Sequence, residues 1–179
     1  MLKPKHLGSL LLWWVYFSYL ITIIEMVLII ALPLLQKYLI NCDLIIKISD
    51  FCWLYFSKQC HQMPSRSLFI FKHQMFVCNR CFFVMIGNIL TISILLKKKY
   101  LKEFLKHKAV FLALIIPPLI VELILKIFFS YASNFFVRSI NGLCQGAASY
   151  SIVFIVINFL NKKFSFTNIL YLVNYYKEK

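Results

Sequence analysis

The sequence predicts an all-α integral membrane protein, a four-helix bundle with an interfacial helix or loop at the outer face between its first two spans. Composition is the first observation behind this prediction. Hydrophobic residues make up 61% of the chain and charged residues only 15%, which excludes an ordinary soluble domain. The second observation is the length of the apolar runs. A transmembrane helix needs about 20 mostly apolar residues, and the chain has four such runs.

The four predicted spans are about residues 7–35, 75–96, 109–129 and 139–160. The first is longer than the apolar stretch of about 7 to 15 residues in a cleaved signal peptide, so we expect it to be an uncleaved anchor. No internal repeat, flexible linker or low-complexity tract divides the chain. We therefore expect residues 1–179 to form one four-span membrane domain.

Lysine placement predicts the orientation of these spans. The net charge of +14 would suit a nucleic-acid ligand, but the lysines lie where membrane topology requires them. They precede the first span, follow the fourth, and six of them fall with His107 in residues 97–108. By the positive-inside rule these segments face the cytoplasm. We expect a multi-pass protein of the cell (inner, cytoplasmic) membrane with both termini cytoplasmic and no nucleic-acid partner. Residues 36–74 then face outward, although their five Lys and Arg residues follow the rule imperfectly.

The outer loop carries the pattern of an amphipathic helix. Apolar residues recur there at helical spacing while Asp43, Lys47 and Asp50 fall on other faces, which predicts a helix at the outer interface. The apolar positions are Leu44, Ile45, Ile48, Cys52 and Tyr55. The tail from Phe164 to Lys179 mixes aromatic residues with Asn and Lys, and it predicts a second interfacial helix on the cytoplasmic side.

Four residues of metal-ligand type come close together in sequence: Cys60, His61, Cys78 and Cys81. Thiolates and imidazole are ligands that suit zinc, which takes four ligands in a tetrahedral structural site. Cys78 and Cys81 would share one face of a helix, at i, i+3 spacing. We therefore predict a zinc-class metal site. Cys60 and His61 are adjacent and point in different directions, so both need not reach the ion.

The same cysteines suit two other interpretations. A C-x-x-C pair can form a disulfide or carry out thiol exchange, and the outer side of the membrane permits oxidation. Free cysteines are also often buried as small apolar side chains, which is our interpretation of Cys42, Cys52 and Cys144. Metal binding and redox chemistry stay open as alternatives for the other three cysteines.

Charged side chains inside the spans mark a polar centre, because an ionisable group in hydrocarbon costs about 3 kcal/mol or more. At about 1.5 Å of rise per residue, Glu122 lies about 10 Å below the outer end of its span and Cys81 about 8 Å below that of its own. We predict catalytic roles for Arg80, Glu122 and Arg138 in this leaflet. The alternative is structural, with Glu122 paired to Arg80 or Lys126 to hold the helices together.

Gln62, Arg66, Ser67 and Asn134 complete the predicted centre as substrate-binding residues. Together with the arginines of the spans, Arg66 would attract an anionic group such as a lipid headgroup or a small anion. The lipid bilayer is the other expected partner.

Small residues line one face of the fourth predicted span. Gly142 and Gly146 stand four residues apart and are followed by Ala147 and Ala148. Such a face lets another helix approach closely, so we predict that its role is packing.

These residues resemble the signature of a family of small, uncharacterised prokaryotic membrane proteins, defined as a domain of unknown function. The matching motifs are C-H-Q-x-P-x-R-S at residues 60–67, C-x-R-C at residues 78–81, Pro118 with Glu122, and N-x-x-x-R-x-x-x-G-x-x-x-G at residues 134–146. Phe83 stands where the family usually has Gly, and Glu122 where it usually has Asp. The resemblance covers roughly residues 50–150. It implies a membrane location and a shared polar centre, and it brings no settled activity.

Three functions follow from these patterns. The first is a Cys/His metal centre, zinc-like, or a thiol centre at the outer face, with an unknown reaction. The second is a membrane thiol–disulfide oxidoreductase that uses Cys78 and Cys81, similar to the four-helix quinone-linked enzymes, although the turn near residues 130–138 lacks a second Cys pair. The third is a non-enzymatic transporter subunit or assembly partner whose polar centre only fixes helix packing.

Overall fold

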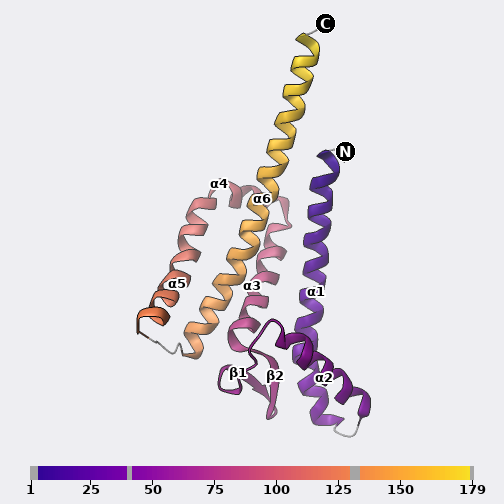
Figure 1. Ribbon diagram of the computed structural model, residues 1–179, viewed down its shortest axis with the longest axis vertical. Coiled ribbons are helices and arrows are strands. Elements are labelled where there is room, and N and C mark those ends of the chain that lie inside the picture. The colour runs from indigo at the N-terminus through magenta and orange to yellow at the C-terminus, as the bar shows by residue number, and fades with distance from the viewer. Residues whose placement is uncertain (1–3, 40–41, 130–133, 178–179) are drawn as a thin grey trace.

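The computed structural model describes residues 4–39, 42–129 and 134–177 (Figure 1). The chain is mostly helical. The helices are α1 (Pro4–Tyr38), α2 (Asp43–Ser57), α3 (Asn79–Leu95), α4 (Lys98–Lys106), α5 (Lys108–Phe129) and α6 (Phe135–Lys177). Between α2 and α3 lie a 3-10 turn, η1 (Pro64–Arg66), and an antiparallel hairpin of β1 (Ser67–Ile70) and β2 (His73–Cys78).

Two helices within the described part of the chain are long and apolar enough to cross a membrane. They are Trp13–Tyr38 within α1 and Phe135–Leu160 within α6. A third qualifies only when α3 is taken together with Tyr100–Lys106 of α4, to which it is bent by 103°. The predicted helical membrane-type fold is thus confirmed in part, and the four-span bundle stays a prediction. α5 occupies the range of the third predicted span.

The hairpin corrects the all-α prediction. Phe71 and Lys72 join its strands with φ angles of 48° and 71°, the left-handed conformation that two-residue hairpin turns favour. Neither is Gly, Asn or Asp, so the turn carries no signal in the sequence. Residues 75–78, predicted as the start of the second span, are the last residues of β2, and α3 starts at Asn79.

α2 is the helix predicted in the outer loop, but its buried face is displaced from the predicted one. Leu44 and Tyr55 are exposed. The buried positions are Ile45, Ser49, Cys52 and Phe56. Phe56 packs on Phe76 of β2, with ring centroids 6.4 Å apart, in a core that α1 joins through Ile29. The apolar burial therefore fastens the hairpin between α1 and α2.

Glycines bring α3 and α6 into contact. A Cβ atom at Gly146 would lie 2.3 Å from the carbonyl oxygen of Val84, and one at Gly142 would lie 2.6 Å from that of Arg80. Gly87 of α3 faces α6 equally closely. No side chain fits at such distances, so the predicted packing role of the small-residue face is confirmed.

The two ends of the molecule differ. α2 and the hairpin lie at one end, whereas α4, the start of α1 and the last part of α6 lie toward the other (Figure 1). The tail from Phe164 is helical, as predicted, but it continues α6 without a break to Lys177 and is not a separate element. Its interfacial location stays a prediction. Residues 130–133 of the predicted outer turn, and the side chain of Lys126, lie outside the described part of the chain.

Candidate metal centre

Three elements bring three cysteines together. Cys60 follows α2, Cys78 ends β2 and Cys81 lies in the first turn of α3. All three are free thiols. Their Sγ atoms all lie within 4.8 Å of one another, and those of Cys78 and Cys81 are 3.5 Å apart. In a tetrahedral site with Zn–S bonds of about 2.3 Å, neighbouring sulfur atoms are about 3.8 Å apart. The cluster therefore fits three ligands of one ion.

Two glutamines hold the loop that carries Cys60. Gln62, whose φ is 49°, donates hydrogen bonds from Nε2 to the carbonyl oxygens of Trp53 and Phe76, both at 2.9 Å. Gln74 of β2 donates to the carbonyl oxygen of Gln62 at 2.7 Å and to Ser67 Oγ at 3.1 Å. These bonds tie the loop to α2 on one side and to the hairpin on the other, which fixes Cys60 beside Cys78.

Local hydrogen bonding favours a thiolate in the cluster. The backbone N–H of Cys78 donates to Cys60 Sγ at 3.1 Å, and Cys78 immediately precedes α3, whose N-terminal dipole favours negative charge. The hydrogen bond with the Cys60 thiol, followed by that with Cys81, lowers the pKa of Cys78. Burial has the opposite effect at Cys52, where it raises the pKa of the thiol.

A polar cavity of about 460 Å³ adjoins the cluster, and Cys60 and Cys81 form part of its wall. Its polar lining comes from α1, the end of α2, α3 and α6. These residues include Glu25, Gln59, Arg80, Asn88 and Gln145. Glu25 accepts a hydrogen bond from the Tyr55 hydroxyl at 2.6 Å, and this bond is the main cause that raises the pKa of Tyr55. The cavity gives the sulfur cluster a polar neighbourhood inside an otherwise apolar bundle.

Behind this cavity, Arg80 of α3 forms an ion pair with Glu122 of α5. Glu122 is buried, and its Oε2 also accepts a hydrogen bond from Asn141 of α6 at 2.7 Å. Three helices therefore meet at one carboxylate. Arg80 Nε is buried without a hydrogen-bond partner among the described residues. The Arg80–Glu122 pair of the structural alternative is present, and the predicted catalytic roles of both residues stay predictions.

Two asparagines near the site, Asn79 and Asn141, were not among the predicted residues. Asn141 is polar within an apolar span, three residues after Arg138, and this position was the available signal. Asn79 is buried at the start of α3 and donates to the Phe135 carbonyl oxygen at 3.0 Å and to Ser139 Oγ at 2.9 Å. Asn79 occupies the variable position of the C-x-R-C motif, so the motif gave no signal for it.

Other predicted site residues lie outside the cluster. His61 is exposed, and the ligand atoms that come together belong to the three cysteines. Arg66 is also exposed. Ser67 donates from Oγ to the Met63 carbonyl oxygen at 2.9 Å, so it braces the loop as Gln62 does.

Asn134 and Arg138 lie at the start of α6. Asn134 Oδ1 accepts the backbone N–H of Val137 at 3.0 Å, which is the bonding of a helix cap. Arg138 is half-buried in the next turn. The predicted catalytic and substrate-binding roles of these side chains stay predictions.

The family described as predicted membrane proteins, DUF2085, matches residues 60–152, more than half of the chain. The chain belongs to this family. The matched segment begins at Cys60 and contains the whole sulfur cluster and Glu122. The resemblance predicted from the motifs is therefore confirmed at the level of the family. The family description states a membrane location and assigns no reaction.

One relative is the Uncharacterized protein MJ1492 of Methanocaldococcus jannaschii. It is 39% identical to this chain over 67 residues, which cover 37% of this chain and 43% of that protein. The chain thus aligns with less than half of the relative's length. No solved structure matches the chain.

Proposed function

We propose that the chain is a four-span protein of the cytoplasmic membrane whose Cys60, Cys78 and Cys81 bind one zinc-class ion at the outer face. The observation that carries the proposal is the group of three Sγ atoms within 4.8 Å of one another. Soft thiolates select zinc over hard cations. The backbone hydrogen bond to Cys60 Sγ supports it further, since such bonds orient and tune metal-bound sulfur.

The spans of this arrangement are α1, α3, α5 and the first part of α6. Its support is that these helices run in alternating directions along the molecule, with α4 away from the hairpin (Figure 1). α4 contains Lys102 and Lys106. Positive segments then face the cytoplasm. Both termini are cytoplasmic in this arrangement, and the sulfur cluster lies toward the outer surface.

The fourth position of the ion would face the polar cavity. Zinc sites with three protein ligands and one open position are typical of catalysis, where the ion activates water or polarises a bound group. Glu25 supplies a carboxylate to the cavity wall, so it is a candidate to hold a proton there. Glu122 and Arg80 offset each other's charge, and we assign them to holding α3, α5 and α6 together.

Metal analysis of the purified protein tests the proposal. We expect about one zinc ion per chain in protein prepared without chelators. Replacing Cys60, Cys78 or Cys81 by Ser should abolish stoichiometric zinc because each change removes a ligand. Cys144→Ser is the matched control, since this cysteine of α6 lies outside the cluster, and it should keep its zinc. Well-folded wild-type protein that lacks metal and takes up no added zinc would refute the metal centre.

Thiol oxidation is the second candidate, and the 3.5 Å separation of Cys78 Sγ and Cys81 Sγ favours it. In this reaction the two thiols become a disulfide and pass two electrons and two protons to an acceptor of quinone class. Acid quenching and thiol alkylation in intact cells, followed by mass spectrometry, measure the state of the pair. A mixture of reduced and disulfide forms that shifts with the quinone pool supports this candidate. A pair that stays reduced and zinc-bound excludes it.

A further inference from the structure

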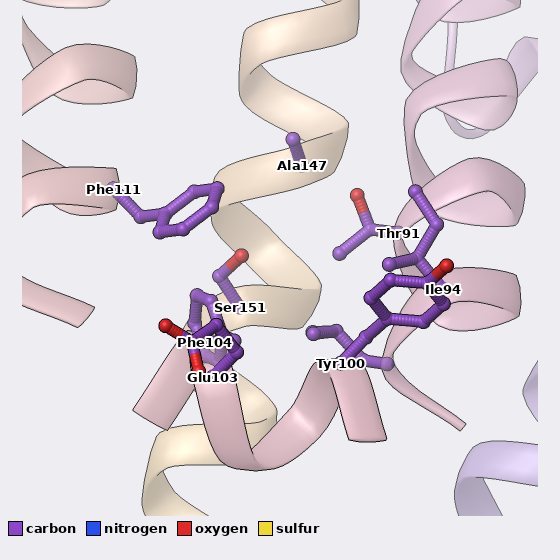
Figure 2. A pocket seen from close by; sticks show the side chains of 9 residues that line it. Thr91, Ile94, Tyr100, Glu103, Phe104, Phe111, Ala147 and Ser151 are labelled. Atoms are coloured by element: carbon purple, nitrogen blue, oxygen red, sulfur yellow. The ribbon is translucent and has the colours of Figure 1, made fainter. Parts of the chain in front are cut away.

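A second cavity, of about 210 Å³, lies between α3, α4, α5 and α6 (Figure 2). Thr91 and Ile94 reach it from α3, Tyr100 and Phe104 from α4, Phe111 from α5 and Ala147 from α6. Thr91 is ten residues beyond Cys81 on the same helix, a distance of about 15 Å along the axis. This cavity is therefore separate from the metal centre and lies toward the end of the molecule that carries α4.

The surface of this cavity is mostly apolar, although Glu103 and Ser151 also line it. Phenyl rings from two helices face it, Phe104 and Phe111, with centroids 5.5 Å apart. An apolar cavity of about 150 Å³ stays free of water and binds benzene, so this larger space suits a hydrocarbon occupant rather than water. An occupant would also supply the dispersion contacts that lining side chains lack beside an empty space. The space fits part of an acyl chain.

The charge beside this cavity indicates what the acyl chain is attached to. Residues 97–108 contain six lysines and a single acid, Glu103, which lines the cavity and pairs with His107 at 3.1 Å, so the segment keeps a positive balance. The Lys97 ammonium lies 5.9 Å from the centroid of the Tyr100 ring, which lines the cavity. Positive charge thus stands at the edge of an apolar space. A molecule with a phosphate at one end and a hydrocarbon chain at the other matches both parts.

α4 is also oriented as an interfacial helix. It is bent by 103° from α3, so it lies nearly parallel to the membrane plane when α3 crosses it. Phe104 is buried at 4% exposure, whereas Lys102 and Lys106 on the same helix are exposed. Lysines at this level contact lipid headgroups.

We propose that this cavity is a binding site for one acyl chain of an anionic phospholipid, whose headgroup phosphate is held by Lys97 and Lys102. The occupant comes from the cytoplasmic leaflet, where anionic lipids bind juxtamembrane basic segments. The site depends on the four-span arrangement and is independent of the cysteines, so its failure leaves the metal centre untouched. It would couple the packing of α4 and α5 to the lipid composition.

Native mass spectrometry of the full chain tests this site. The protein is reconstituted in nanodiscs of phosphatidylglycerol and phosphatidylcholine in equal amounts, released into detergent, and scored for retained lipid. We expect one phosphatidylglycerol to be retained in preference to phosphatidylcholine. Lys97→Gln combined with Lys102→Gln should lower this preference about 30-fold, since each lysine contributes near the surface. Lys47→Gln combined with Lys58→Gln removes the same charge from exposed positions on and next to α2, and it should leave the preference unchanged.

A variant that fills the cavity provides the second test of lipid binding. Ala147→Leu adds bulk to the lining from α6 and should abolish retention of the lipid while zinc content stays that of the wild type. Equal retention of both lipids by the wild type would overturn the proposal, as would undiminished retention by a folded Ala147→Leu protein. Should that variant fail to fold, the two lysine pairs still decide, because equal effects of both pairs would reduce the binding to general surface charge and contradict a built site.

Discussion

Cys78 and Cys52 are both partly or fully buried thiols, yet their surroundings act on them in opposite directions. Hydrogen bonding with the Cys60 and Cys81 sulfurs lowers the pKa of Cys78, which also precedes the positive end of α3. Cys52 lies on the inner face of α2 among apolar side chains, with 3% of its surface exposed. A thiolate is the form that binds metal or reacts with electrophiles. The surroundings of each sulfur therefore distinguish a candidate metal ligand from a cysteine that only packs in the core, and burial alone does not.

In metal-free protein, this difference predicts how alkylation depends on pH. The pKa of Cys78 is lowered, so its thiolate is already present below pH 7 and its rate with iodoacetamide should change little between pH 6 and 8. The pKa of Cys52 is raised, so Cys52 should react slowly and its rate should rise with pH over that range. Peptide mass spectrometry after timed quenching measures both rates. A rate at Cys78 that climbs tenfold per pH unit would contradict the thiolate assignment.

A single substitution at Glu122 tests whether this residue stabilises the fold. Removing it by Glu122→Ala leaves Arg80 without its carboxylate and removes the acceptor of Asn141. We expect a loss of about 3 kcal/mol in unfolding free energy, the lower end of the usual range for a broken buried pair, because 31% of the Arg80 side chain is exposed. Denaturant titration in detergent measures it.

The combined variant Arg80→Ala with Glu122→Ala closes the double-mutant cycle for this pair. It should be less destabilised than the sum of the single variants, because neither charge is then left alone. Wild-type stability in Glu122→Ala would assign the residue to chemistry instead of packing.

Among the elements, α3 and α6 are joined by backbone contact, and this contact makes their glycines sensitive. Gly146→Ala places a methyl group 2.3 Å from the Val84 carbonyl oxygen, and both partners are helix backbone that yields little. Overpacking of this kind costs about 1 to 3 kcal/mol. Ser149→Ala on an exposed position of α6 is the control and should change stability by less than about 0.5 kcal/mol. Equal thermal midpoints for the two variants would show that the helices separate readily.

The elements also show what the sequence could and could not predict. Long apolar runs predicted the positions of α1 and α5 to within a few residues at most ends, because hydrocarbon and helix geometry both demand such runs. The hairpin was missed because Phe71 and Lys72 adopt left-handed conformations without the usual turn residues. α6 runs past Asn161 because neither Pro nor Gly follows to end it.

The candidate site, too, was predictable from the sequence only in part. Spacing of Cys60, Cys78 and Cys81 predicted a cluster, since C-x-x-C across a helix start places two sulfurs on one face. Two features required the folded chain: His61 is turned outward, and Asn141 reaches Glu122 from another helix. Sequence distance carries no information on either, because both depend on how the loop and α6 pack against α3.

At the scale of the whole molecule, polar chemistry is divided between two ends of an apolar bundle. The hairpin, which ends at Cys78, lies at one end, and α4, which carries Lys102 and Lys106, lies toward the other (Figure 1). In the arrangement proposed above, this division would orient the bundle in the membrane and provide two separate places to bind a ligand. It also means that a change at one end can be tested while the other reports on folding.

X-ray absorption spectroscopy at the zinc edge of the purified wild-type protein tests the central claim most directly. The account predicts a zinc ion with three sulfur neighbours at about 2.3 Å and one lighter oxygen or nitrogen neighbour at about 2.0 to 2.2 Å. Such a shell would establish the three-cysteine centre with an open fourth position toward the polar cavity. A shell of four sulfurs, or of oxygen and nitrogen atoms alone, would contradict it.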